Sequence, residues 1–299
     1  MRIPFDSRGW ECVFTSEIDK WARATYAENF GIDEAQIHGD VTKIDENLVP
    51  DHDLLVGGFP CQPFSHAGHK RGFEDTRGTL FFDVQRIIKR KRPKVVLLEN
   101  VRGLLSHDKG HTFGRILEIL NAEYVVHHAL LNARDFGLPQ NRIRIYIVAI
   151  RNDLEGARDW KFPAPNADRG SLKVQDILED SVDPKLTISD RLWASHQARK
   201  ARHLSKGNGF GYRLVNGRSE FTATISARYY KDGSEILLEQ EGKNPRKLSP
   251  REAARLQGFP ESFKPSTSNV QAYKQFGNAV PVNVIDAIAS EIDIFIRGK

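Results

Sequence analysis

Apolar residues in the first half of the chain alternate between short continuous runs and repeats of three and four residues. The continuous runs predict buried strands and the longer repeats predict helices. The predicted strands are 11–16, 53–56, 95–98, 124–131 and 143–150. The predicted helices are 19–29, 80–88 and 113–120, the first with Asp19 as N-cap and Gly31 as its stop. Alternating strands and helices predict an α/β fold with a doubly wound sheet.

This rhythm ends near residue 151, where the sequence becomes basic and rich in turns. We therefore expect a smaller, irregular second domain without helix–strand alternation. The predicted divisions are a first domain at 1–165, a second at 166–264 and a return to the first at 265–299. Ser249 and Glu252 form a capping box with Pro250 at the first helical position, which predicts a helix to Gln257. Apolar residues of 284–295 share one face of a last helix, which we expect to pack on the first domain.

The chain of 299 residues contains two cysteines, Cys12 and Cys61. Two cysteines form neither a disulfide framework nor a zinc site, so we expect free thiols and no metal. The sequence contains no apolar run of membrane-spanning length and no secretory leader, which predicts a cytoplasmic protein.

Positive charge is concentrated in residues 185–218. This segment has eight Lys and Arg residues and one acid, a net charge of +7, whereas the whole chain carries +5. A run of charge is commonly a solvated face, but an excess confined to one segment favours a surface for a polyanion such as nucleic acid.

The apolar run at 54–56 ends in Gly57-Gly58-Phe59-Pro60-Cys61-Gln62-Pro63-Phe64-Ser65. Glycines allow close approach of a ligand, and the two prolines fix the backbone on either side of Cys61. The segment therefore presents a thiol in a rigid turn, as a nucleophile requires. The alternative is that Cys61 is a small buried apolar residue.

Polar residues follow several predicted strands at their carboxyl ends, where open α/β sheets bind ligands. They are Glu17, Asp40, Cys61 and Glu99. Each carboxylate alone could be a helix cap or half of an ion pair. An acid that holds ribose hydroxyls normally follows a glycine-rich turn by about 20 residues, but Glu17 lies only sixteen residues after Met1. Either the site binds no nucleoside, or the turn precedes the start of this sequence.

An ordered set of motifs over essentially the whole chain resembles the bacterial cytosine-C5 DNA methyltransferases of restriction-modification systems. The motifs are Ser16-Glu17-Ile18-Asp19, Gly58-Phe59-Pro60-Cys61-Gln62-Pro63, Arg77-Gly78-Thr79-Leu80-Phe81, Glu99-Asn100-Val101, Gln140-Asn141-Arg142-Ile143-Arg144, Arg246-Lys247-Leu248-Ser249-Pro250-Arg251-Glu252 and Phe276-Gly277-Asn278-Ala279-Val280. The family begins with a strand and a turn rich in phenylalanine and glycine that wraps the methionine part of S-adenosylmethionine. By this resemblance the sequence begins just after that turn.

The resemblance implies a catalytic group of Cys61, Glu99, Arg142 and Arg144. Cys61 would attack carbon 6 of cytosine and Glu99 would serve N3 of the ring. Arg142 and Arg144 are two residues apart on a predicted strand and so share a face. In the family they support the base and lower the pKa of the thiol, whereas the alternative is a surface row of ion pairs.

The resemblance also implies that S-adenosylmethionine is the methyl donor. Glu17 would hold the ribose hydroxyls, Ile18 would pack on adenine and Asp40 would meet the adenine amine. Asn278 would contact the amino-acid end of the cofactor. The residues implied to line the same pocket are Phe59, Pro60 and Leu80.

Double-stranded DNA is the partner implied by the family, with the target base flipped out of the duplex. The loop 65–72, with Ser65, Lys70 and Arg71, would close over that base. Segments 206–212 and 224–233 are similar to recognition segments of enzymes that methylate CCGG, CCWGG and CCNGG sites. We therefore expect a site of the CC…GG kind. The DNA contacts expected in these segments are Lys206, Tyr212, Arg228, Tyr229 and Lys231.

We expect a monomer that acts on duplex DNA and does not associate with a membrane. A cognate restriction endonuclease is an expected companion, with no physical complex implied. Two alternatives stay open. A chain without the glycine-rich turn could bind DNA through its basic domain without methylating it. A tRNA cytosine-C5 methyltransferase of the same superfamily is the other, although the large basic segment favours DNA.

Overall fold

The computed structural model describes residues 1–60, 80–165 and 172–298. The loop predicted to carry Cys61, Ser65, Lys70 and Arg71 lies outside these residues. None of the helices in the described ranges is long and apolar enough to span a membrane.

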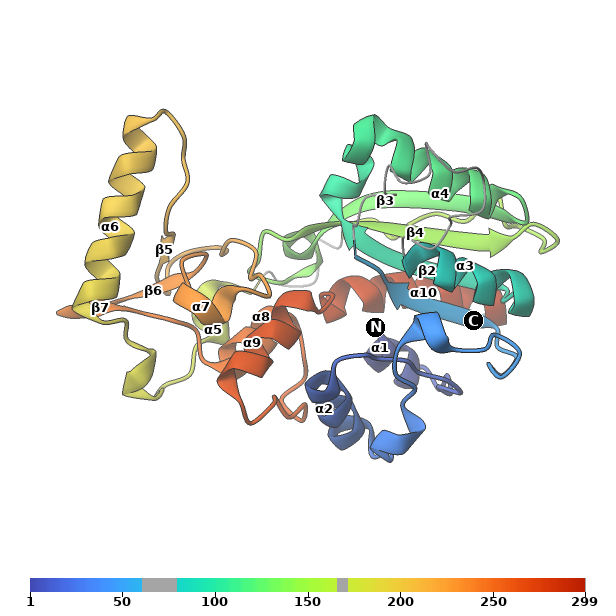
Figure 1. Ribbon diagram of the computed structural model, residues 1–299, viewed down its shortest axis with the longest axis horizontal. Coiled ribbons are helices and arrows are strands. Elements are labelled where there is room, and N and C mark those ends of the chain that lie inside the picture. Colours follow the sequence, from blue (N-terminus) through green and yellow to red (C-terminus); the bar gives the residue numbers. More distant parts are fainter. Residues whose placement is uncertain (61–79, 166–171, 299) are drawn as a thin grey trace.

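A four-stranded mixed sheet forms the centre of the first unit (Figure 1). Its strands are, in spatial order, β1 (Leu54–Gly58), β2 (Val95–Val101), β4 (Ile143–Arg151) and β3 (Tyr124–Asn132). β1 runs parallel to β2, and β4 is antiparallel to both of its neighbours. The continuous apolar runs at these four places therefore form strands, as predicted.

Helices cover both faces of this sheet. Val95 and Leu97 of β2 pack in one apolar cluster with α10 (Val282–Arg297). Val96 and Leu98 point to the opposite cluster, with α3 (Leu80–Lys91) and α4 (His111–Asn121). Since alternate residues of a strand face opposite sides, the near-continuous apolar run in β2 follows from burial on both faces. The doubly wound α/β class and the return of the last helix are confirmed.

The N-terminal part contains α1 (Arg2–Asp6) and α2 (Lys20–Phe30). The Asp19 side chain accepts hydrogen bonds from the amides of Trp21 and Ala22, and Gly31 ends α2 with a left-handed φ of 62°, as predicted. Short 3-10 turns lie at η1 (Glu34–Gln36), η2 (Val41–Lys43), η4 (Arg102–Leu105), η5 (His107–Gly110), η6 (Ala133–Phe136) and η7 (Pro184–Leu186).

The predicted strand 11–16 is wrong. Its only pairing within the described chain is a parallel bridge between Ser16 and His38. Pairing stops there because Asp40, two residues after His38, accepts a hydrogen bond from the amide of Thr42 and begins η2. A side-chain cap therefore replaces the ladder that a strand would need.

The second unit has a separate apolar core. Its elements include α5 (Val174–Ile177), β5 (Leu214–Val215), α7 (Tyr229–Asp232), β6 (Leu237–Gln240), β7 (Lys243–Arg246), α8 (Pro250–Leu256) and α9 (Asn269–Asn278). The capping box predicted at Ser249 and Glu252 opens α8. Ala272, Tyr273 and Phe276 of α9 belong to this second core, so the change of core follows α9 rather than residue 265.

The helix α6 (Asp190–Ser205) was not predicted from the sequence, which indicated only a turn-rich unit without helix–strand alternation. Ser189 caps α6 by accepting a hydrogen bond from the amide of Leu192. His196 is the one buried residue of the helix. Because α6 has no apolar stripe to bury, its periodicity is weak, and it depends on capping and on residues of high helix propensity.

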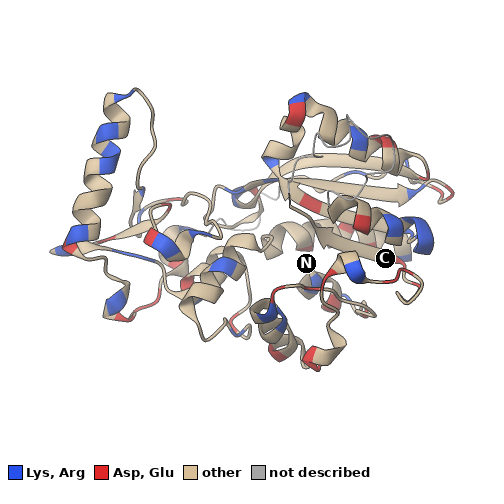
Figure 2. Cartoon of the chain, in the orientation of Figure 1, with Lys and Arg blue, Asp and Glu red and all other residues tan. Residues whose placement is uncertain are grey.

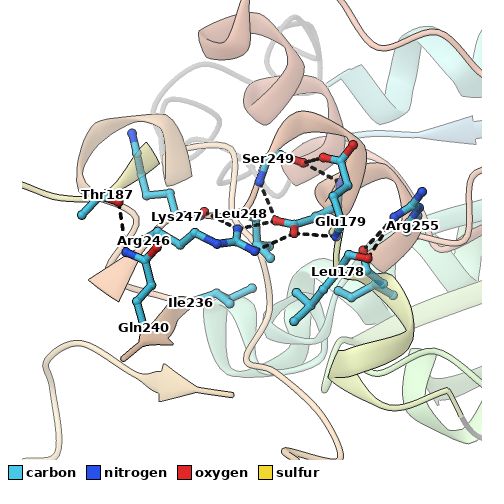
Figure 3. Close-up of polar contacts among 12 residues, drawn as sticks. Leu178, Glu179, Thr187, Ile236, Gln240, Arg246, Lys247, Leu248, Ser249 and Arg255 are labelled. Carbon is cyan, nitrogen blue, oxygen red and sulfur yellow. Dashed lines mark hydrogen bonds and ion pairs between the residues drawn. The ribbon is translucent and has the colours of Figure 1, made fainter. Parts of the chain in front are cut away.

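A buried ion pair joins β7 to α8 in the second unit (Figure 3). Both terminal nitrogens of Arg246 donate to the Glu252 carboxylate, at 2.7 and 2.8 Å. The same carboxylate accepts from the amides of Ser249 (2.8 Å) and Glu179 (3.0 Å). The Ser249 hydroxyl in turn donates to Glu179. The fully buried Glu252 is therefore satisfied by four donors.

Candidate active site

A carboxylate and a guanidinium meet at the carboxyl end of β2. Glu99 lies opposite Tyr146 in the β2–β4 ladder, and Arg144 is two residues from Tyr146 on the same face. This diagonal relation lets the two side chains reach each other. Arg144 Nε lies 3.2 Å from Glu99 Oε1, with the side chains 14% and 12% exposed.

Two opposing effects act on the Glu99 carboxyl. Burial raises its pKa above the ordinary value, and the nearby charges of Arg144 and then Arg142 lower it in part. The outcome is a raised pKa, since removal from water outweighs the cations. Glu99 therefore holds a proton more readily than an exposed glutamate does.

The end of β1 lies beside this pair. Gly58 is opposite Glu99 in the parallel ladder, and a methyl group on Gly58 would lie 3.5 Å from Glu99 Oε2. Asn100 Nδ2 donates to the carbonyl of Phe59 at 2.7 Å and so ties the residue after β1 to β2. Cys61 is three residues beyond Gly58 in the sequence and lies outside the described residues. The structure thus brings the start of the cysteine loop to Glu99.

Arg142 has surroundings different from those of Arg144. It immediately precedes β4 and is 2% exposed. Its guanidinium donates to the carbonyls of Ile225, Gly277 and Ala279 rather than to Glu99. Burial, followed by the charge of Arg144, lowers its pKa to about 10, so it stays charged at neutral pH. The two arginines are two residues apart in the sequence, but their head groups do not share a partner.

The predicted cofactor residues Glu17 and Asp40 lie on adjoining segments. The amide of Glu17 donates to the carbonyl of His38 at 2.8 Å, next to the Ser16–His38 bridge. A hollow of about 360 Å³ is lined by Phe14, His38, Gly39, Asp40, Lys43, Ile44, Asp45 and Leu48. Hydrogen bonds from the hydroxyl and amide of Thr42 lower the pKa of Asp40, which keeps it ionised.

The other predicted cofactor residues differ in how far their side chains are exposed to solvent. Ile18 is 67% exposed and Asn278 is also exposed, whereas Phe59 is buried against Phe81. Leu80 packs at the edge of the α3–α4 core, and Pro60 is exposed. An exposed aliphatic side chain between carboxylates fits the ring and hydroxyls of a nucleoside. Within the described ranges, no group of three or more His, Cys, Asp or Glu residues could hold a metal ion.

The predicted DNA contacts separate into surface and core residues. Lys206, Arg228 and Lys231 are exposed, and basic residues recur along α6 in Figure 2. Tyr212 is partly buried against Trp193, with their ring centroids 4.7 Å apart. Tyr229 is fully buried and its hydroxyl donates to the carbonyl of Ile236. The prediction that Tyr229 contacts DNA is therefore corrected, because its ring fills the core of the second unit.

Sequence reasoning gave no role to three buried amides. Asn100 ties the Phe59 carbonyl to β2, and Gln140 and Gln257 join segments distant in the chain. Asn100 and Gln140 stand inside motifs noted above. A polar residue beside an apolar run is the available signal, because a buried amide must find partners.

Comparison with known proteins agrees with this architecture. The family model of the C-5 cytosine-specific DNA methylases matches residues 1–293. Type II methyltransferase M1.ScrFI of Lactococcus lactis subsp. cremoris is 61% identical over 94% of this chain and 71% of its own. Type II methyltransferase M.DsaV of Dactylococcopsis salina is 53% identical over 99% of this chain and 83% of its own. The crystal structure of S. pombe Dnmt2 methyltransferase superposes with a TM-score of 0.74 at 20% identity, covering 98% and 94% of the two chains, which shows a shared fold.

The mixed α/β sheet has the Glu99–Arg144 pair near the carboxyl end of β2, and the family model places the chain in the cytosine-C5 class of methyltransferases. The chain belongs to the C-5 cytosine-specific DNA methylase family, and it is a DNA cytosine-5-methyltransferase of the restriction-modification type.

Proposed function

We propose that this protein methylates carbon 5 of a flipped-out cytosine in duplex DNA at a site of the CC…GG kind, through a covalent bond to Cys61. The observation that carries the proposal is that the Glu99–Arg144 pair lies beside Gly58, the last residue of β1. Cys61 follows Gly58 by three residues in the sequence.

The chemistry needs a nucleophile because carbon 5 of cytosine is itself a poor one. Addition of the Cys61 thiolate to carbon 6 forms a sulfur–carbon bond and moves the ring's π electrons toward carbon 5 and N3. Carbon 5 can then accept an electrophilic methyl group. Loss of the proton from carbon 5 expels the thiolate and restores the double bond, so the cysteine is regenerated.

Glu99 supplies the group that this electron shift requires. Its raised pKa favours a protonated carboxyl, which can donate to N3 as negative charge arrives there. Arg144 fixes one carboxylate oxygen at 3.2 Å and so orients the other. The same carboxyl can accept from the exocyclic amine of cytosine and thereby select the base.

S-adenosylmethionine, when bound, supplies the electrophilic methyl group. Glu17 would hold the ribose hydroxyls, Ile18 would cover one face of adenine and Asp40 would accept from the adenine amine. Asn278 would meet the amino-acid end. The exposed Ile18 and the ionised Asp40 support this assignment.

Recognition of the DNA sequence is assigned to the second unit. Exposed Lys206, Arg228 and Lys231 lie in the two segments similar to those of CC…GG enzymes, and positive side chains can contact phosphates and guanine edges. The loop carrying Ser65, Lys70 and Arg71 would close over the flipped base.

The proposal is tested by incubating the protein with S-adenosylmethionine and duplex DNA containing CC…GG sites, then measuring 5-methylcytosine by mass spectrometry. We expect product with the wild type and with Cys12→Ala, which replaces the other cysteine, and none with Cys61→Ala. Activity that survives in Cys61→Ala would contradict the covalent route. Salt-dependent DNA binding with no cofactor binding would favour a DNA-binding role, and equal transfer to tRNA would contradict DNA as the substrate.

A further inference from the structure

Three buried polar side chains meet where the two units join. Gln140, Arg142 and Gln257 are each at most 2% exposed, and we call them the polar hub. Gln140 and Arg142 lie in the segment that enters β4, and Gln257 follows α8. Buried amides and guanidinium groups are costly unless they are hydrogen-bonded, so their partners show what the hub holds.

Ile225 is the partner from the second unit. Its amide donates to Gln140 Oε1 at 3.0 Å, and its carbonyl accepts from Arg142 Nη1 at 2.9 Å. Neighbouring backbone bonds join Asn141 to Thr222 (2.9 Å) and Thr222 to Pro139 (2.8 Å). Segment 222–225 is therefore fastened along 139–142 at successive residues.

The end of α9 is the other partner. Arg142 Nη2 donates to the carbonyls of Gly277 and Ala279, at 2.9 and 2.8 Å, on either side of Asn278. Gln257 Nε2 donates to the carbonyl of Phe276 at 2.5 Å, and Gln140 Nε2 lies 3.2 Å from Gln257 Oε1. One guanidinium thus joins segment 222–225 to the α9–α10 junction.

Gly277 shows how closely these segments approach. A methyl group placed on Gly277 would lie 2.2 Å from the amide nitrogen of Ala227 and 2.4 Å from the carbonyl oxygen of Ser226. Backbone therefore meets backbone at this point, and Arg142 donates to a carbonyl on each side of the contact.

The two segments that the polar hub joins lead to different groups of proposed functional residues. Segment 222–225 continues to the exposed residues Arg228 and Lys231, which are proposed to contact DNA. The other segment continues from Arg142 to Arg144, which pairs with Glu99. A proposed DNA contact, Arg228, is thus three residues from Ile225, and Arg144 is two residues from Arg142.

We propose that Arg142 is a positioning residue that fixes segment 222–231 against the Arg144–Glu99 pair, so that correct DNA sequence and productive base geometry are coupled. This inference rests on the proposed function. A displacement of about 1 Å at reacting groups can lower a rate by about 10²-fold, so loosening of the hub should act on kcat and on discrimination between sites. A hub that only stabilises the fold would change neither in the folded protein.

The test compares Arg142→Lys and Arg142→Met with Arg151→Met. Arg151 is the last residue of β4, and its guanidinium donates to the Asp153 carboxylate and the Arg92 carbonyl. Lysine keeps the charge but not the forked donors. Thermal melting first establishes a temperature at which every variant is folded. Hydrogen exchange of segment 222–231, kcat, and DNA affinity are then measured on a CC…GG duplex and on one with a single changed base.

We expect Arg142→Lys to speed exchange in 222–231 and to lower kcat at least tenfold, with DNA affinity changed less than threefold. The ratio of kcat/KM between the two duplexes should also fall, and Arg142→Met should show larger effects. Arg151→Met should match the wild type. Unchanged exchange, kcat and discrimination in both Arg142 variants would overturn this inference alone, whereas a wild type that transfers no methyl group would overturn the proposed function.

Discussion

Glu99 is the residue at which burial and charge compete most clearly. Burial raises its pKa and Arg144 lowers it, so removal of the Arg144 charge raises the pKa further. If protonated Glu99 donates to N3, activity falls as pH rises through this pKa. We predict that Arg144→Met lowers kcat and also moves the alkaline limb of the pH–kcat profile to higher pH. Arg151→Met should leave the limb in place, and a limb that moves to lower pH contradicts the assignment.

Gly277 and Gly114 are both helical glycines without left-handed φ, in α9 and α4. A methyl group on Gly114 meets nothing within 4 Å, whereas one on Gly277 overlaps the backbone of 226–227. We predict that Gly114→Ala stabilises the fold by about 0.5–1 kcal/mol, since alanine loses less backbone entropy. Gly277→Ala should destabilise it by about 1–3 kcal/mol or more through overpacking. Urea unfolding measures both, and equal midpoints would contradict the close approach.

Candidate site residues could be predicted one by one only where their chemistry has a local signature in the sequence. Glu99 comes directly after the apolar run 95–98 and lies near the carboxyl end of β2, so its place near the sheet end was predictable. The partners of Arg142 were not, because its acceptors are carbonyls of residues 225, 277 and 279, up to 137 positions away. Backbone carbonyls occur at every residue and leave no mark in a sequence.

Helices and strands, too, were predictable where their cause is local in the sequence and not where it depends on a distant partner. α2 and α8 carry their caps in the sequence and were predicted with their ends. α6 was missed because it buries only His196, and strand 11–16 was wrong because its neighbour turns into η2 after one bridge. A helix cap is encoded by residues next to the helix. A strand also needs a neighbouring segment to pair with, and the sequence of the strand does not show how far that segment stays extended.

The ion pair between β7 and α8 gives a prediction at the scale of these elements. Arg246–Glu252 and Arg115–Glu118 have the same shortest N–O distance of 2.7 Å, but the first pair is buried and the second exposed. Arg246→Met leaves the Glu252 carboxylate buried without its cation and should cost about 3–5 kcal/mol of unfolding free energy.

Arg115→Met is the matched control and should cost about 0–1 kcal/mol, because water screens an exposed pair. Chemical unfolding gives both values. Similar losses in the two variants would contradict the view that Glu252 depends on Arg246 within the second unit.

For the molecule as a whole, the sequence predicted two unequal units and a last helix that returns to the first. The packing of α10 on the central sheet confirms the return of the last helix. The place where the chain changes core was less predictable. α9 follows a turn-rich stretch and carries an apolar face, but that face packs with the second core. Periodicity shows that a face is buried and does not show against what.

The most direct test of the central claim uses a CC…GG duplex in which the target cytosine carries fluorine at carbon 5. Fluorine cannot leave as a proton does, so the step that expels the thiolate is blocked and the protein should remain bonded to the DNA. With S-adenosylmethionine present, we predict an intact mass equal to protein plus DNA plus one methyl group, with the adduct mapped to Cys61. Enzyme that methylates the ordinary duplex but forms no adduct, or forms it at another residue, would contradict covalent catalysis by Cys61.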